Sequence, residues 1–340
     1  MTRKDTILKY IVEHFISTAE PVGSKTLLET YHLNCSSATI RNEMNALENE
    51  GYLEKTHTSS GRVPSEKGYE YYVKNLRGQR VDEQVKNALQ VVLDKKIKSV
   101  EQVMQEACEI LSNMTNLASA VLGPSAQEER LVKVQVIPLS ANSATAVFVT
   151  DKGYVENKTF ILDDALAMND LEKMITTLND RLTGSKISEV LPKLEAMRPA
   201  LTDYFVNQKM LYEVLFEAFV RFTGERMELY GKDALFHQPE FESDAKKLRR
   251  LIGLLDDPKA FREAVKEGAD AGDGVSVKIG KEGEDLSIVS ASVQIPGEGP
   301  GTTLTVLGPT RMDYDKVVSI LQYFAETLEK YFADQTKGDK

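Results

Sequence analysis

Hydrophobic positions in the first 30 residues follow a helical period in two segments. Apolar side chains three and four positions apart over residues 4–19 predict a first helix with one buried stripe. Residues 20–23 contain Pro21 and Gly23 and interrupt that stripe. A short second helix is expected over residues 25–30, with Ser24 in position to cap it. The chain therefore begins with two helices joined by a tight connection.

A third helix is expected between the serine pair 36–37 and Gly51. Three apolar side chains, those of Ile40, Met44 and Leu47, share one of its faces. At about 100° per residue the opposite face carries Ala38, Asn42, Asn45 and Asn49, with Arg41 on its flank. Arginine can hydrogen-bond guanine and asparagine can hydrogen-bond adenine, so this face can read bases. An ordinary surface helix made of poor helix formers remains the alternative.

The segment after Gly51 predicts a β-hairpin. Residues 51–55 begin a strand, residues 56–62 form a small polar loop with a basic tip, and Val63 begins the return strand before a helix over residues 69–76. Three helices followed by such a hairpin predict a winged helix–turn–helix, whose recognition helix enters the major groove while the wing touches the backbone or minor groove. The candidate DNA contacts are Ser37, Thr39, Arg41, Asn42 and Asn45 on the helix and Lys55, His57, Ser60 and Arg62 on the wing. His57 is equally well a solvated loop histidine without a role.

The rest of the chain alternates between helical and strand patterns. Residues 81–118 are helical, with an apolar repeat that fits a packed helix or a short coiled coil. Alternating patterns predict an antiparallel meander over residues 132–160 and a helix over 165–182. Residues 190–270 are mostly helical, and strand patterns return after residue 274, ahead of a last helix over residues 314–332.

Strands, then helices, then strands again predict a sheet domain interrupted by an insert. A broad apolar stripe lies on the helix pattern of the insert, and either a core or a subunit interface explains it; its members are Met210, Leu211, Val214, Leu215, Ala218, Phe219 and Phe222. The fold class is therefore α+β with several domains. The predicted domains are residues 1–80, a discontinuous sheet domain of residues 81–190 and 271–335, and an insert of residues 191–270.

Charge is divided unevenly along the chain. The net charge is −10, yet residues 1–80 hold eleven basic and ten acidic side chains. Residues 54–80 hold six basic against three acidic ones, which makes this segment the expected place of phosphate contact. With 41% hydrophobic residues, two cysteines, no apolar stretch of about 18 residues and no signal-peptide core at the start, we expect a reduced, cytoplasmic protein without a membrane span.

Catalytic and metal-binding patterns are missing from the sequence, so we expect neither an enzyme nor a cofactor or metal. Three of the four histidines fall in the first domain, and no HExxH, CxxC or P-loop pattern occurs. The glycine-rich residues 297–301 are expected to form a hairpin loop. Residues 308–314 follow a strand and precede a helix; Asp313 is placed to cap that helix and Arg311 to pair with a carboxylate.

Several long motifs resemble one bacterial family. EPVGSKTL at 20–27, SSATIRNEMNALENEGYLEKTHTSSGRVPSEKGYEYYV at 36–73 and LGPTRMDYDKVV at 307–318 are similar to the heat-inducible transcription repressor HrcA, as are QPEF at 238–241 and KLRRLIGLL at 247–255. The matches extend from about residue 3 to about residue 325. A winged helix alone is shared by many regulators, so the resemblance depends on its pairing with GPTRMDY.

The resemblance implies a fold and a function. The fold would be a winged helix, a GAF-like domain, and a dimerising domain inserted in the GAF-like part. The function would be repression of chaperone operons by a homodimer on an inverted repeat, the CIRCE element, with activity that depends on the GroEL chaperonin. Two alternatives stay open: a GAF-type regulator that senses a small molecule, and a winged helix that binds protein rather than DNA.

Overall fold

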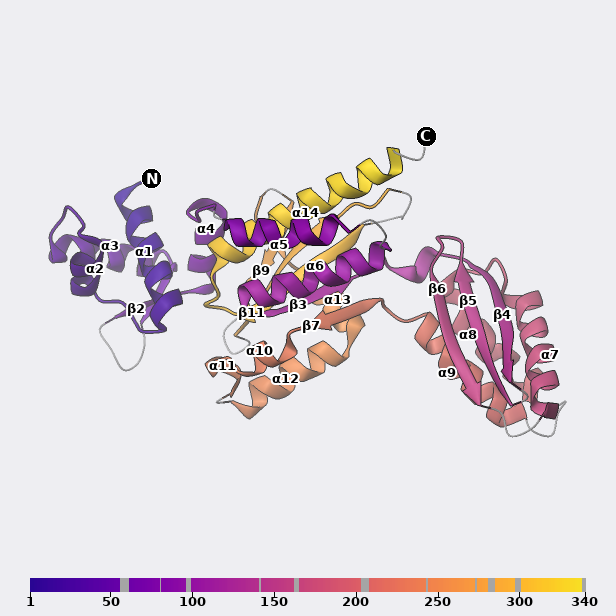
Figure 1. Cartoon of the computed structure of the whole chain (residues 1–340). Coiled ribbons are helices and arrows are strands. Elements are labelled where there is room, and N and C mark those ends of the chain that lie inside the picture. Colours follow the sequence, from indigo (N-terminus) through magenta and orange to yellow (C-terminus); the bar gives the residue numbers. More distant parts are fainter. Residues whose placement is uncertain are drawn as a thin grey trace. The chain divides into compact units, whose positions relative to one another are not determined.

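The computed structural model describes residues 1–55, 61–79, 81–95, 99–140, 142–161, 165–202, 208–242, 244–272, 274–280, 285–296 and 301–337. The chain divides into two compact units (Figure 1). Unit 1 contains Met1–Gly123, Met227–Pro296 and the segment from Gly301 onward, and unit 2 contains Pro124–Arg226. Helices and antiparallel sheets occur in both units, which confirms the α+β class.

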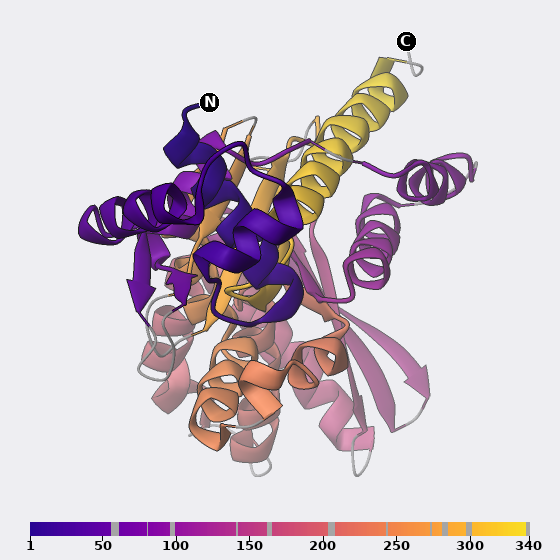
Figure 2. The same ribbon diagram turned by 90° about the vertical axis from the view of Figure 1, so that its left-hand side faces the viewer.

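The N-terminal region of unit 1 has the element order that the sequence predicts. It runs α1 (Arg3–Thr18), α2 (Ser24–Tyr31), α3 (Ser37–Asn49), β1 (Leu53–Lys55), β2 (Arg62–Pro64) and α4 (Glu66–Asn75). Figure 2 turns this region toward the viewer, with its two short strands beside the helices. The predicted apolar stripes of the helices meet in one core, built around Ile7, Ile11, Leu27, Ile40 and Leu47, each at most 1% exposed. Burial of these stripes removes apolar surface from water and holds the short helices together.

The remainder of unit 1 is built on a six-stranded antiparallel sheet in the order β7-β3-β11-β10-β9-β8. The strands are β3 (Ala118–Leu122), β7 (Met227–Tyr230), β8 (Ala269–Asp270), β9 (Val275–Lys278), β10 (Leu286–Val293) and β11 (Thr302–Pro309). Figure 1 shows α5 (Glu83–Leu93), α6 (Val100–Thr115) and α14 (Tyr314–Lys337) on one face of the sheet. The opposite face is covered by α10 (Lys232–Phe236), α11 (Pro239–Glu242), α12 (Ala245–Asp256) and α13 (Pro258–Lys266). Because both faces are covered, nearly every residue of β10 and β11 is buried.

Unit 2 is an antiparallel meander backed by helices. Strands β4 (Leu131–Ser140), β5 (Ser143–Thr150) and β6 (Val155–Ile161) pair in sequence order, after the 3-10 turn η1 (Ala126–Glu128). The helices are α7 (Ala165–Leu182), α8 (Ile187–Thr202) and α9 (Gln208–Phe222). Phe148 of β5 packs against Phe219 and Phe222 of α9, with ring centroids 4.9 Å and 5.2 Å apart. The apolar stripe of the predicted insert is therefore the core of unit 2 rather than an exposed interface.

The units differ from the domain boundaries that the sequence predicts. The meander of residues 131–161 was expected in the sheet domain, but its strands pair only with one another among the described residues, and α9 covers their inner face. Conversely, α10–α13 were expected in the insert, but they pack on the six-stranded sheet. The insert of this structure is thus residues 124–226 instead of 191–270. Helix and strand patterns did not reveal which sheet each helix covers.

Candidate nucleic-acid interface

Helix α3 presents the polar face that its periodicity predicts. The Ser36 side chain caps the helix by accepting a hydrogen bond from the Thr39 backbone N–H at 3.1 Å. Ile40, Met44 and Leu47 are at most 4% exposed, whereas Arg41, Asn42 and Asn45 are exposed. One turn of the helix therefore offers a guanidinium and two amides to the solvent.

Ser37 and Thr39 lie at the start of α3, where they are half-buried. The Ser37 hydroxyl shares a hydrogen bond of 3.0 Å with the hydroxyl of Ser24, the first residue of α2. The Thr39 hydroxyl shares one of 2.9 Å with Ser36. The first bond joins the N-terminal ends of α2 and α3, and the second lies within the N-terminal cap of α3.

The hairpin is anchored to the connection between α1 and α2. Strands β1 and β2 pair antiparallel, and Arg62 exchanges two backbone hydrogen bonds with Val22, of 2.8 Å and 2.9 Å. A Cβ on Gly61 would lie 2.8 Å from the Pro21 side chain, so only glycine permits this approach. Of the four predicted wing contacts, His57 and Ser60 lie outside the described residues.

Arg62 does not lie where the sequence analysis expected it. Rather than forming an exposed basic tip, it begins β2, and its side chain is only 9% exposed. Its Nε donates to the carboxylate of Glu48 at 2.8 Å, and its Nη2 donates to Asn45 Oδ1 at 3.1 Å. The guanidinium is directed at α3, because a carboxylate there compensates its charge.

Glu48 joins the helix to the hairpin and was not among the sequence candidates. One of its carboxylate oxygens faces Arg62, and the other lies 3.0 Å from Lys55 Nζ. Burial by itself raises the pKa of Glu48, but hydrogen bonds and charge from Lys55 and Arg62 outweigh it and lower the pKa below its usual range. The sequence signal that could have identified Glu48 is its position three residues after Asn45, which places both side chains on the edge of α3 nearest the hairpin.

The residues after Gly308 connect the six-stranded sheet to the N-terminal region. Asp313 accepts a hydrogen bond from the Lys316 backbone N–H at 3.0 Å, which caps α14, and Arg311 pairs with Glu240, both as the sequence suggested. Asp315 accepts hydrogen bonds from the Tyr72 hydroxyl at 2.7 Å and from the Gly78 N–H at 3.0 Å. One carboxylate therefore holds both α4 and the segment that follows it.

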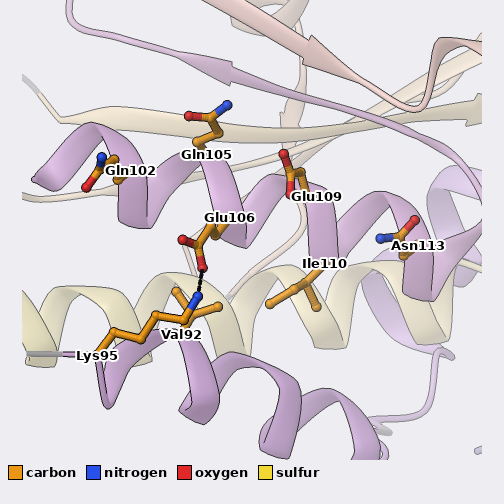
Figure 3. A pocket seen from close by; sticks show the side chains of 8 residues that line it. All are labelled: Val92, Lys95, Gln102, Gln105, Glu106, Glu109, Ile110 and Asn113. Carbon is orange, nitrogen blue, oxygen red and sulfur yellow. Dashed lines mark hydrogen bonds and ion pairs between the residues drawn. The ribbon is translucent and has the colours of Figure 1, made fainter. Parts of the chain in front are cut away.

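The described part of unit 1 contains grooves in at least two places. One of about 700 Å³ lies between α5 and α6. Two of its lining residues, Lys95 and Glu106, form an ion pair of 3.1 Å; Figure 3 shows their side chains pointing toward each other. Another, of about 480 Å³, is lined by residues from both the N-terminal region and the sheet, among them Tyr69, Thr310 and Arg311. The Tyr69 and Thr310 hydroxyls are buried and have no hydrogen-bond partner in the described part of the chain.

The described residues contain neither a cluster of metal-ligating side chains nor a membrane-spanning helix. No group of three or more histidine, cysteine, aspartate or glutamate side chains there can hold a metal ion. No helix there is long and apolar enough to cross a membrane.

Known proteins resemble this chain in both sequence and fold. Residues 101–318 match the family model of the HrcA protein C terminal domain. The heat-inducible transcription repressor HrcA of Halalkalibacterium halodurans is 37% identical over 339 residues, which cover 98% of this chain and 97% of that protein. The crystal structure of a hypothetical protein at 2.2 Å resolution shares the fold, with a TM-score of 0.63 and 24% identity over 98% of this chain and 99% of the other. The chain belongs to the family of the heat-inducible transcription repressor HrcA.

Proposed function

We propose that this chain represses transcription by binding duplex DNA through a winged helix–turn–helix formed by α1–α4 and the β1–β2 hairpin. The observation that carries the proposal is the exposed face of α3, where Arg41, Asn42 and Asn45 can reach base edges in a major groove. The half-buried Ser37 and Thr39 lie at the helix start, where contact with a phosphate is expected. Repression by occupation of promoter DNA requires no catalytic group, in keeping with a family of repressors.

The hairpin supplies a second, weaker contact. Lys55 is exposed and its pairing with Glu48 is open to solvent, so a phosphate can replace the carboxylate at little cost. Arg62 takes a different role from the wing contact that the sequence suggested, since it is held in place by Glu48 and Asn45. His57 and Ser60 stay candidate wing contacts on sequence grounds.

A homodimer on an inverted repeat completes the proposal. In unit 2 the outer face of the β4-β5-β6 sheet carries exposed apolar side chains, including Ile137 at 45%, Val155 at 51% and Ile161 at 85%. Isolated exposed apolar residues are common, but three on one sheet face favour a protein contact. We assign this face to a second copy of the chain, so that residues 124–226 act as the dimerising insert of a GAF-like sheet domain.

The biological setting is proposed from the family alone. A cytoplasmic repressor of this family would act on chaperone operons through a CIRCE-type inverted repeat. Its activity would depend on GroEL, so that repression falls when heat occupies the chaperonin with unfolded proteins. Adding GroEL to a binding assay and measuring the active fraction of repressor tests that dependence.

A gel shift on an inverted-repeat duplex tests DNA binding. Arg41→Ala is expected to weaken binding by about 1–3 kcal/mol and to relax the base preference, because a bidentate contact to guanine would be lost. A scrambled duplex is the control that separates base reading from phosphate attraction. Equal binding of both duplexes by the unaltered chain would indicate phosphate attraction without base reading, and binding to neither would favour a winged helix that recognises protein.

Light scattering with size-exclusion chromatography tests the dimer. Ile161→Lys places a charge on the outer sheet face and is expected to convert the dimer to a monomer without unfolding unit 2. Lys158→Ala changes a residue on the opposite face of the same strand, so it is the control and should leave the mass unchanged. A dimer that survives Ile161→Lys together with Ile137→Lys would place the interface elsewhere.

A small-molecule sensor is the second candidate, favoured by the groove of about 480 Å³. Buried hydroxyls without partners, such as those of Tyr69 and Thr310, are costly unless a ligand or water satisfies them. A thermal-shift screen of polar metabolites, repeated with Tyr69→Phe, tests this function. A compound whose stabilisation disappears in Tyr69→Phe would support the sensor.

A further inference from the structure

The side-chain amide of Asn45, on the outward face of α3, is held by a residue of the hairpin. Arg62 Nη2 lies 3.1 Å from Asn45 Oδ1. A guanidinium has five N–H donors and no acceptor, so the amide atom that faces it must be the oxygen. The orientation of the Asn45 amide is therefore set by the donor chemistry of the guanidinium.

Arg62 is itself fixed by Glu48. The guanidinium approaches Glu48 Oε2 from two nitrogens, at 2.8 Å and 2.7 Å, and the Arg62 side chain is 9% exposed. Hydrogen bonds between charged groups are the stronger kind, and a nearly buried arginine cannot leave its carboxylate without a large cost. Asn45 Oδ1 is thus tied to a rigid group on the protein side of α3, whereas its NH₂ end is left for the solvent side.

This orientation bears on how Asn45 can read a base. Asparagine recognises adenine by donating to N7 and accepting from N6 at once, which requires both amide ends to face the base. Guanine presents two acceptors in the major groove, N7 and O6, and an NH₂ group alone can satisfy them. Resting on the proposed function, we propose that Asn45 reads base edges as a donor only and favours guanine over adenine. Glu48 and Arg62 are the positioning residues that set this preference.

The test begins with the full-length chain and a duplex library with randomised half-sites. Selection gives the preferred duplex, and Asn45→Ala locates the base pair at which preference is lost. Four duplexes that differ only at that base pair then measure the preference as a ratio of dissociation constants. We expect guanine to be bound about tenfold more tightly than adenine, the size of one good base contact. Failure to enrich any duplex would overturn the proposed function and this inference with it.

Arg62→Met removes the donor that restrains Asn45, and it is expected to shift the preference toward adenine by about tenfold. The matched control is Lys55→Met, which removes a charge from the same Glu48 carboxylate but does not touch Asn45. It should weaken binding to all four duplexes equally and leave their ratio unchanged. If Arg62 had only a structural role, Arg62→Met would likewise weaken binding to all four duplexes equally. The ratio of dissociation constants therefore distinguishes a structural role from a positioning role.

Asn45→Asp is a second variant at an exposed position and keeps the inference testable if Arg62→Met fails to fold. It replaces the outward NH₂ with an acceptor while the other oxygen still faces Arg62, so preference should invert toward cytosine, whose N4 donates. An adenine preference in the unaltered chain, or an unchanged ratio in folded Arg62→Met, would overturn the inference while leaving the proposed function intact. An unchanged preference in Asn45→Asp would overturn it as well.

Discussion

The Asp315 carboxylate holds α4 and the segment after it, at positions 243 and 237 residues away along the chain. It accepts hydrogen bonds from the Tyr72 hydroxyl and the Gly78 N–H. Burial, followed by the charge of Asp315 and this hydrogen bond, raises the pKa of Tyr72 well above its usual range, so the phenol stays a donor at every working pH. Asp315→Asn is the informative change, because it keeps the shape and removes one acceptor.

The expected cost follows from those two bonds. A hydrogen bond to a charged group contributes about 1.5–3 kcal/mol, and a neutral one about 1 kcal/mol. An asparagine at this position keeps one neutral bond and turns its NH₂ toward the other donor, which is then left unsatisfied. We therefore expect Asp315→Asn to lower the free energy of unfolding of unit 1 by about 2–4 kcal/mol.

Asp313→Asn is the matched control. It removes the same charge two residues away, but Asp313 only caps α14, and asparagine caps as well as aspartate does. Both carboxylates also raise the pKa of Glu13 through repulsion, so the difference between the two variants isolates the hydrogen bonds of Asp315. We expect Asp313→Asn to change stability by less than about 0.5 kcal/mol.

Urea unfolding followed by tyrosine fluorescence measures the two variants, since the chain has 13 tyrosines and no tryptophan. Hydrogen exchange at the Gly78 amide reports the lost contact directly and should accelerate in Asp315→Asn alone. Equal stability of the two variants, with unchanged exchange at Gly78, would refute the reasoning.

Two further predictions concern charges at other positions. Arg226 forms a bidentate pair with Glu129, which is 7% exposed, so Arg226→Met should destabilise unit 2 by about 3–5 kcal/mol in hydrogen exchange. Arg221→Met, which removes an exposed arginine, is its control, and similar exchange in both would contradict the prediction. Burial raises the pKa of Glu13 in the folded chain above its pKa in the unfolded chain. The protonated form therefore contributes stability that is fully present below the unfolded-state pKa and is lost as the pH rises through the folded-state pKa. The Glu13→Gln variant should therefore have a higher melting temperature than the unaltered chain at about pH 7, and its melting temperature should depend less on pH. Identical melting curves of the two proteins from about pH 4 to pH 7 would contradict this prediction.

Much of the candidate interface could be predicted from the sequence because it depends on local periodicity. The spacing of Ile40, Met44 and Leu47 determined which side of α3 is buried and therefore which side carries Arg41 and Asn45. Gly51, at φ +80°, ends the helix where a glycine was expected to do so. Such features involve residues within a few positions of one another, so helix geometry alone relates them.

Domain boundaries could not be predicted in the same way. The strands of residues 131–161 and the helices α10–α13 were recognised as a meander and a helical region, but each was assigned to the wrong unit. An amphipathic pattern shows that a helix has one buried face and a strand has one buried side. It contains no information about which partner surface covers that face, because many surfaces remove the same apolar area from water.

The sequence by itself determined the fold class, the exposed polar face of α3 and the hairpin that follows it. The tertiary structure alone decided that Arg62 turns inward to Glu48, 14 residues earlier, and that Asp315 holds Tyr72, 243 residues away. Whether a charged side chain faces solvent or another element depends on the distance to a compensating group. That distance is set by packing between elements, whereas periodicity fixes only directions within one element.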